Sequence, residues 1–156
     1  MSDAPDEQHT RPAGTSDAAV AAAGKVTEAL ETLERARGHL HDFHQLVGST
    51  DLALDEALEL LGEAGRDDVA ERLQERLVGR NVLAGRWTFQ VLEEFDDGCW
   101  SVFREEERHV RDELVGGRRH VFESEMKEAR RTRGNPAHMA RPDGPTPAGT
   151  PAAHGG

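Results

Sequence analysis

Residues 22–47, AAGKVTEALETLERARGHLHDFHQLV, carry the pattern that decides the fold. Apolar residues advance through this stretch in alternating steps of four and three, which is the heptad spacing of a helix that packs along one side. Alanine alternates with a larger residue, which lets a partner helix approach closely. The stretch therefore predicts one long amphipathic helix, with charged residues on its flanks and outer face. Its seam consists of Ala22, Val26, Ala29, Leu33, Ala36, Leu40, Phe43 and Val47, and the charged residues are Glu28, Glu31, Glu34, Arg35 and Arg37.

Two shorter helices are expected after this one. Residues 48–51, Gly-Ser-Thr-Asp, would end the long helix and supply the N-cap of a second helix, whose apolar face lies at residues 54–61. Gly65 would end that helix, and Asp67 would cap a third. Because the connection between them is short and polar, the second and third helices are predicted to form a helical hairpin.

The second half of the chain contains another seam. Residues 87–91 alternate like a strand, but no other segment looks able to pair with them, so we favour a helix. Four-three spacing then predicts a second long helix. Gly116 and Gly117 in its middle cost about 2 kcal/mol relative to two alanines, so either the helix breaks there or another backbone crosses close to it. The seam positions are Trp100, Phe103, Glu107, Val110, Leu114, Gly117, Val121 and Ser124.

Together these elements predict an all-α protein. The expected architecture is a helix bundle in which the two long amphipathic helices pack antiparallel, with the short helical hairpin between them. A single helical domain would span residues 17–133. Residues 1–16 are predicted to be a disordered tail, as are residues 134–156, which hold five of the seven prolines and five glycines.

Composition narrows the classes of function. The net charge is −11, from 19 Lys and Arg against 30 Asp and Glu, which opposes general binding to nucleic acids. The sequence has no apolar run of roughly 18 residues and no signal segment, so a cytoplasmic location is expected. Cys99 is the single cysteine, which excludes an internal disulfide and a cysteine-based zinc site within one chain. Its neighbour Trp100 favours a buried or semi-buried thiol.

Histidines and carboxylates suggest a metal site. His41 and His44 are three residues apart on the first helix, so their imidazoles can share a face. On the last helix, Glu106 and His109 have the Glu-x-x-His spacing of di-iron helical bundles. Such bundles need two copies of this motif and two further glutamates, and the chain has one copy. Exposed histidines, or a hydrogen-bonded histidine cluster, are the alternatives.

Glu107 lies on the apolar seam between Phe103 and Val110. A buried carboxylate without a partner is costly. One hypothesis is therefore that Glu107 pairs with His44 or Arg37 of the first helix and fixes the register. The alternative is that the seam is open to water at this position.

A cluster of arginine, tryptophan, amide and carboxylate side chains surrounds the glycine-marked turn at residues 79–86. These residue types are typical of interaction hot spots. They are equally typical of an internal network that fastens a loop to a bundle. The cluster comprises Arg80, Asn81, Arg86, Trp87, Gln90, Glu94 and Asp97.

Residues 118–133 form a basic end, with six basic residues against three glutamates. This end is a candidate contact for nucleic acid or an acidic partner, but no aromatic stacking residues are interleaved with it. Basic residues also favour a helix C-terminus through the helix dipole. Phosphate-binding, dinucleotide-binding, nucleophile-elbow and zinc-protease motifs are all missing, so no catalytic residue and no cofactor is predicted.

Residues 80–83 (Arg-Asn-Val-Leu), 85–91 (Gly-Arg-Trp-Thr-Phe-Gln-Val) and 93–98 (Glu-Glu-Phe-Asp-Asp-Gly) resemble an uncharacterised family of small helical actinobacterial proteins with no assigned function. Residues 110–114 and 116–120 fit the same family, so the resemblance covers roughly residues 33–133. The resemblance implies an intracellular bacterial protein and an aromatic residue where Cys99 stands. It brings no activity, ligand or catalytic residue.

The sequence as a whole predicts a non-enzymatic protein–protein interaction module whose partner is another protein or a second copy of the chain. One alternative is a helical bundle that binds a metal or a small ligand through His41, His44, Glu106 and His109. The other is a regulator that contacts nucleic acid through the basic C-terminal helix.

Overall fold

The computed structural model describes residues 3–141, and within this range the protein is helical without a β-strand. The sole β-type contact there is an isolated bridge between Leu83 and Arg86. The predicted all-α class is therefore confirmed. The elements are η1 (Glu7–His9), α1 (Asp17–Glu63), α2 (Asp67–Arg76), α3 (Thr88–Phe95), the π-helical turn η2 (Asp96–Trp100), α4 (Ser101–Val115), α5 (Val121–Arg130) and η3 (Pro136–His138).

The chain divides into two compact units where the sequence suggested one domain. Unit 1 comprises Met1–Lys25 and His109–Gly156, and unit 2 comprises Val26–Arg108. Helices α1 and α4 each contribute residues to both units. A 47-residue helix such as α1 is several times longer than an average globular helix, so its residues need not all belong to one core.

Helix α1 continues through residues 48–51, where the sequence predicted a break. The Thr50 hydroxyl donates to the Leu46 carbonyl oxygen at 2.8 Å, so it bonds within the helix. Asp51 accepts a hydrogen bond from the Gly79 amide at 2.8 Å and caps no new helix. The predicted first arm of the hairpin is therefore the last part of α1. That helix ends before Gly65, which has φ +68°, as predicted.

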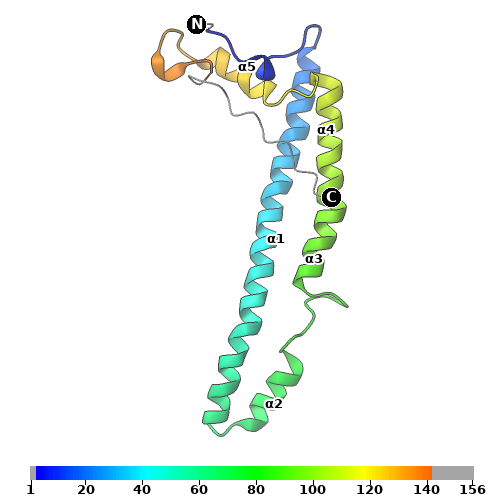
Figure 1. The fold of residues 1–156 in the computed structure, drawn as a ribbon, viewed down its shortest axis with the longest axis vertical. Coiled ribbons are helices and arrows are strands. Elements are labelled where there is room, and N and C mark those ends of the chain that lie inside the picture. The colour runs from blue at the N-terminus through cyan, green and yellow to red at the C-terminus, as the bar shows by residue number, and fades with distance from the viewer. Residues whose placement is uncertain (1–2, 142–156) are drawn as a thin grey trace, which may run out of the picture. The chain divides into compact units, whose positions relative to one another are not determined.

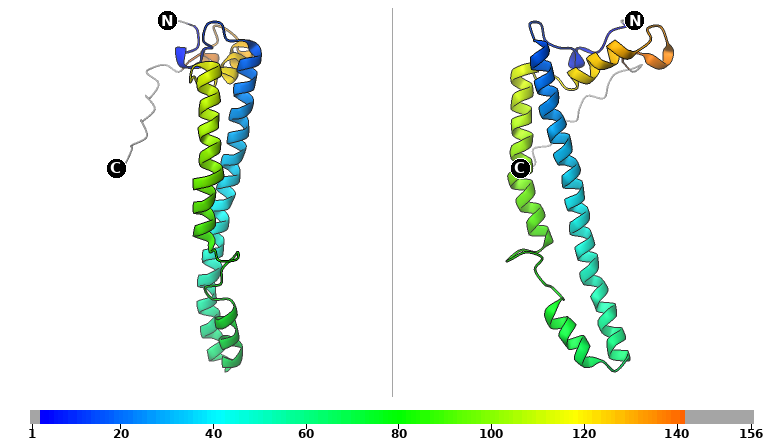
Figure 2. Two further views of the ribbon diagram at one scale, coloured as in Figure 1. Left: turned by 90° about the vertical axis from the view of Figure 1, so that its right-hand side faces the viewer. Right: turned by 180° about the vertical axis from the view of Figure 1, so that it is seen from behind.

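Unit 2 is an antiparallel pair of helical segments (Figures 1 and 2). One segment is α1 from Val26 onward, and the other runs without interruption through α3, η2 and α4 as far as Arg108. The helix predicted for residues 87–91 is confirmed, and Asp96-Asp97-Gly98 lie inside the π-helical turn. Successive residues along α1 form hydrogen bonds with progressively earlier residues of the other segment, which is the order that an antiparallel pair requires. Their pairs are Thr27 with Glu107, Glu34 with Trp100, Arg37 with Asp96 and His44 with Thr88.

The second long helix breaks at Gly116-Gly117, which settles the alternatives left by the sequence. Gly116 and Gly117 have φ angles of +60° and +72°, and His120 has φ +53° before α5 begins. Glycine adopts positive φ at little cost, so the pair ends α4. A close approach occurs elsewhere in unit 1, because a Cβ on Gly24 would lie 3.2 Å from the Cβ of Phe122.

Unit 1 has a small apolar core of Val20, Ala23, Val115 and Val121, with Leu114 packed against it. Residues 3–16, which the sequence predicted to be disordered, contact α5 in this unit. The Arg11 guanidinium donates to both oxygens of Glu125 and to Asp17. Of the predicted C-terminal tail, residues 134–141 include η3, and residues 142–156 lie outside the described residues, as do residues 1–2.

Gly116→Ala is expected to destabilise the protein by about 1–2 kcal/mol, because an alanine must hold a left-handed backbone there. Gly38→Ala is the matched control, since Gly38 lies inside α1 and a Cβ on it would meet no atom within 4 Å. That change is expected to stabilise the helix by up to about 1 kcal/mol. Urea denaturation measures both. Equal effects of the two substitutions would contradict the assigned end of α4.

Candidate functional site

The interface between α1 and the second segment of unit 2 is polar at its most buried points. Residues 26–108 are all described, and Thr88 and Glu107 are the two that are fully buried among them. Every fully buried apolar side chain in the described part of the chain belongs to unit 1. Unit 2 therefore holds its two segments together through hydrogen bonds and half-buried apolar residues.

The strongest polar contact joins Arg37 of α1 to Asp96 of η2. Arg37 Nε and Nη2 donate to the two carboxylate oxygens at 2.7 and 2.9 Å, which is the paired geometry that guanidinium and carboxylate prefer. The guanidinium also lies 4.0 Å from the centre of the Trp100 ring, whose Nε1 donates to Glu34. The sequence placed most of the charged residues of α1 on its flanks and outer face; Glu34 is exposed, as expected, whereas Arg37 is half-buried against η2.

Hydrogen bonding by Arg37, followed by its positive charge and that of His41, holds the pKa of Asp96 below the ordinary value of 3.8. The Arg37–Asp96 contact therefore contributes its full stability above about pH 4 and loses it as the pH falls through the lowered pKa. Asp96→Asn is expected to lower the melting temperature at neutral pH and to make the loss of stability in acid smaller. The neighbouring exposed Asp97→Asn is the control. Equal acid sensitivity in both variants would contradict this role for Asp96.

Glu107 is buried, at 6% exposure, so the possibility of an open seam at this position is excluded. Its Oε1 accepts a hydrogen bond from the Thr27 hydroxyl at 2.9 Å. The predicted partners were wrong, because Arg37 pairs with Asp96 and His44 Nδ1 bonds to the Thr88 hydroxyl at 2.7 Å. Threonine carries no charge, so nothing in the residue type at position 27 predicts this contact with a carboxylate.

The residues proposed for a metal site do not form one in the structure. Within residues 3–141, no group of three or more His, Cys, Asp and Glu side chains lies close enough to hold a metal ion. His44 is engaged by Thr88, and the buried Nε2 of His41 has no hydrogen-bond partner. Glu106 and His109 are both exposed. The geometry thus offers no support for metal binding. Of the alternative, a hydrogen-bonded histidine cluster, the structure shows one member, His44, whose partner is Thr88.

The predicted interaction cluster is in part an internal network. Arg86 Nε donates to Glu94, and the Gln90 side chain accepts from the Trp87 amide at 2.8 Å, which caps the start of α3. The Trp87 ring contacts Phe89 edge-on, with 6.5 Å between centroids. Arg80, Asn81 and Asp97 are exposed. Two large apolar side chains in the same region, Leu83 and Phe89, are about half exposed.

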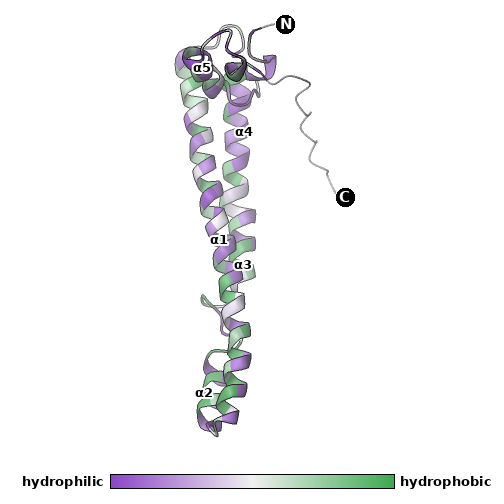
Figure 3. Ribbon diagram, turned by 90° about the vertical axis from the view of Figure 1, so that its left-hand side faces the viewer, coloured by the Kyte–Doolittle hydropathy of each residue, from purple (hydrophilic) through white to green (hydrophobic). Residues whose placement is uncertain are grey.

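Helix α1 has a covered side and an uncovered side in unit 2. With Val26, Leu33, Leu40 and Val47 as heptad positions a, the residues at a and e from 26 to 51 are all partly buried. The c, d and g positions from 28 to 50 are all exposed, and we call these residues the open face. Hydrophobic positions recur along this part of α1 (Figure 3). The open face comprises Glu28, Ala29, Thr32, Arg35, Ala36, His39, Asp42, Phe43, Leu46, Ser49 and Thr50.

The second segment therefore covers only one side of the predicted apolar seam of α1. Its larger residues at position a face the second segment, and the seam residues Ala29, Ala36 and Phe43 at position d do not. Polar residues at position e, such as Arg37 and His44, take the contacts instead. Their spacing of seven residues is a sequence signal that could have identified the covered side.

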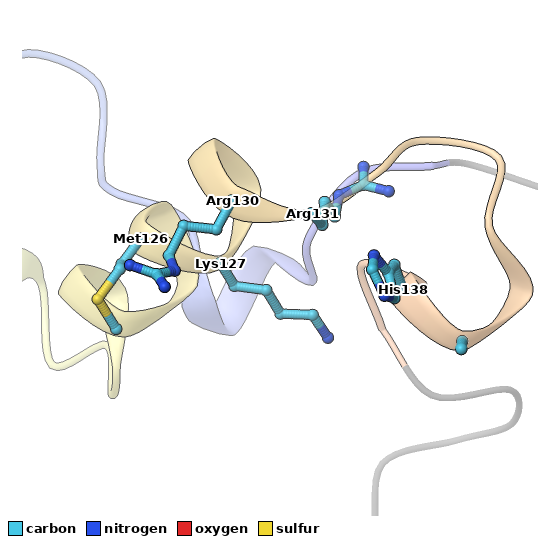
Figure 4. Close-up of a pocket in the computed structure, with 6 residues that line it drawn as sticks. Met126, Lys127, Arg130, Arg131 and His138 are labelled. Carbon is cyan, nitrogen blue, oxygen red and sulfur yellow. The ribbon is translucent and has the colours of Figure 1, made fainter.

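The basic end holds unit 1 together. Arg118 donates to the Thr10 carbonyl oxygen, and Arg131 bonds to Glu128 and Asp3. A shallow cavity of about 340 Å³ lies between α5 and the loop at η3. In Figure 4, Arg130 bends back towards Met126 while Lys127 extends towards the side of His138. Because Arg131 is committed to internal ion pairs, the basic run serves in part to fix residues 3–16 on α5.

Cys99 lies in the π-helical turn and is exposed, whereas the sequence favoured a buried or semi-buried thiol. The extra residue in a π-helical turn changes which positions face α1. Trp100 therefore contacts Glu34 while its neighbour Cys99 points to solvent.

No helix in the described part of the chain is both long and apolar enough to cross a membrane. Comparisons of the chain with protein-family models, with curated proteins and with solved structures yield no match.

Proposed function

We propose that the chain is a non-enzymatic helical protein–protein interaction module, and that unit 2 carries its binding surface. The observation behind this proposal is the distribution of apolar side chains in residues 26–108. Nine large ones are between 39% and 71% exposed, and none is fully buried. They are Phe43, Leu46, Leu52, Leu60, Leu77, Leu83, Phe89, Val102 and Phe103.

This distribution is unfavourable for an isolated unit. A domain gains most of its stability by burying apolar surface, and the margin over chain entropy is small. With 39% to 71% of each side chain exposed, these nine residues leave a large total apolar area in water. This area is distributed over α1, α3, α4 and the segment between α1 and α3, so a single partner covers part of it. Covering that part with another chain would stabilise the unit.

The cluster at residues 80–97 fits the edge of such a surface. Leu83 and Phe89 offer apolar area, and the Arg86–Glu94 ion pair beside them fixes the polar side chains in place. A rigid apolar centre with a polar rim is the usual composition of an interface. The absence of catalytic motifs from the sequence agrees with a binding role.

Site-specific photocrosslinking in the native cell tests the proposal. A photoreactive phenylalanine analogue replaces Phe43, Leu83 or Phe89 in separate variants of the full chain, and Glu71 of α2, which is exposed and charged, serves as the control position. We expect a discrete adduct with a protein chain from at least one apolar position and none from position 71. Failure of all three positions to form an adduct would overturn the proposal.

A further inference from the structure

The open face of α1 has features that specify its occupant. From these we infer that a second copy of the chain packs its own open face against the first, antiparallel, about a two-fold axis near His39. This inference rests on the proposed function and names the partner. Residues 28–50 belong to unit 2 alone, so the argument needs no other part of the molecule.

Side-chain size changes along the open face in a way that complements its reversed copy. Before His39 the central residues are small, namely Ala29, Thr32 and Ala36, and after it come the large Phe43 and Leu46. An antiparallel copy centred near His39 places Phe43 of each chain opposite Ala36 of the other. Leu46 similarly meets Thr32. In a two-fold interface each such contact occurs twice, so one match of size serves both chains.

Charges on the open face favour the same arrangement. Arg35 and Asp42 both occupy position c, on one edge of the face, and both are exposed. The two-fold axis brings Arg35 of each chain next to Asp42 of the other, which gives two ion pairs across the interface. In a parallel pair the two c edges would lie on opposite sides of the interface, which removes these ion pairs, and the large residues Phe43 would lie at the same level. The antiparallel arrangement is therefore preferred on both charge and size.

Net charge does not oppose this pairing. Residues 26–108 hold 20 Asp and Glu against 9 Lys and Arg, a net charge of −11, and a strongly basic partner would suit most of that surface. On the open face, however, the formal charges are those of Glu28, Arg35 and Asp42, which leaves it close to neutral. A neutral face with a large and a small half fits a copy of itself better than it fits a basic chain.

Cysteine crosslinking gives a direct test of the register. The variants are made in the full chain with Cys99→Ser, because Cys99 is the single native cysteine and is exposed. Ala29 and Thr50 lie at equal distances on either side of the axis. We expect a mixture of Ala29→Cys and Thr50→Cys chains to form mixed disulfide dimers on oxidation, with little product from either variant alone. His39→Cys, at the axis, is expected to link to itself.

A parallel dimer would link Ala29→Cys to itself and Thr50→Cys to itself, and that result would overturn the inference. Absence of any disulfide dimer in the mixture and in His39→Cys would also overturn it. If the photocrosslinks capture only a different protein, the inference fails and the proposed function stands. If they capture nothing while the mixed disulfides also fail to form, both are wrong.

A charge exchange provides independent evidence without cysteines. Arg35→Asp and Asp42→Arg each place like charges together twice across the axis, and each is expected to weaken association roughly fivefold. The double variant Arg35→Asp/Asp42→Arg restores both pairs and is expected to return to the native dissociation constant. Sedimentation equilibrium measures all four proteins. Additive weakening in the double variant would contradict the antiparallel register.

Discussion

Val115→Asp is expected to destabilise unit 1 by about 4 kcal/mol or more and to abolish the protection of α5 from amide exchange. Val115 is 2% exposed and belongs to a core of four fully buried residues. A carboxylate at this position loses its hydration and gains no described cation as a partner in the core. So small a core has little stability to spare, and a substitution of this kind is among the most damaging classes. Hydrogen exchange resolved by segment measures the loss over residues 121–130.

Val102→Asp is the matched control for that experiment. Val102 is the same residue type on the same helix, α4, but it is 57% exposed. We expect its effect on stability to stay within about 0.5 kcal/mol, as for most surface substitutions. Retained protection of α5 in Val115→Asp would show that the four-residue core does not hold unit 1 together.

Phe43→Glu is expected to weaken self-association about a hundredfold. Phe43 is the largest side chain on the open face, and in the antiparallel dimer it lies opposite Ala36 of the other chain. An aromatic residue that fills a small-residue site at the centre of an interface commonly dominates the binding free energy. The glutamate also brings two new negative charges near the axis. The dissociation constant from sedimentation equilibrium reports the effect.

Leu52→Glu tests whether self-association uses the open face or any exposed apolar side chain. Leu52 lies on the same helix at position f, on the side away from Phe43, and it is more exposed, at 71% against 44%. If exposure alone drove association, Leu52→Glu would have the larger effect. We expect it to leave the dissociation constant unchanged within about twofold, because the open face does not include it.

Local sequence predicted most of the helices well. It predicted a helix end correctly at glycines with positive φ and wrongly at the capping residues 48–51. Gly65 and Gly116-Gly117 end helices because their backbones adopt positive φ. Residues 48–51 looked similar in sequence, but Thr50 bonds back to Leu46 and Asp51 is drawn to the amide of Gly79, 28 residues away. Such a long-range partner overrides a local capping signal, and a single sequence does not reveal it.

The site was less predictable because a helix has more than one usable face. The heptad pattern identified the apolar residues of α1, yet the second segment covers positions a and e and leaves position d open. Which side is covered depends on contacts such as Arg37–Asp96 and Thr27–Glu107, and these join residues 59 and 80 positions apart. The π-helical turn also changes the helical phase between Phe95 and Trp100, and no residue type in Asp96–Trp100 predicts such a turn.

Sedimentation equilibrium of the unmodified full chain, over about a hundredfold range of concentration, tests most directly whether the open face of α1 packs against a second copy. The weight-average mass is expected to rise from that of one chain to that of two and then to level off, with a melting temperature that rises in parallel. The mass of a single chain at every concentration, together with a cooperative melting temperature that does not depend on concentration, would contradict the account.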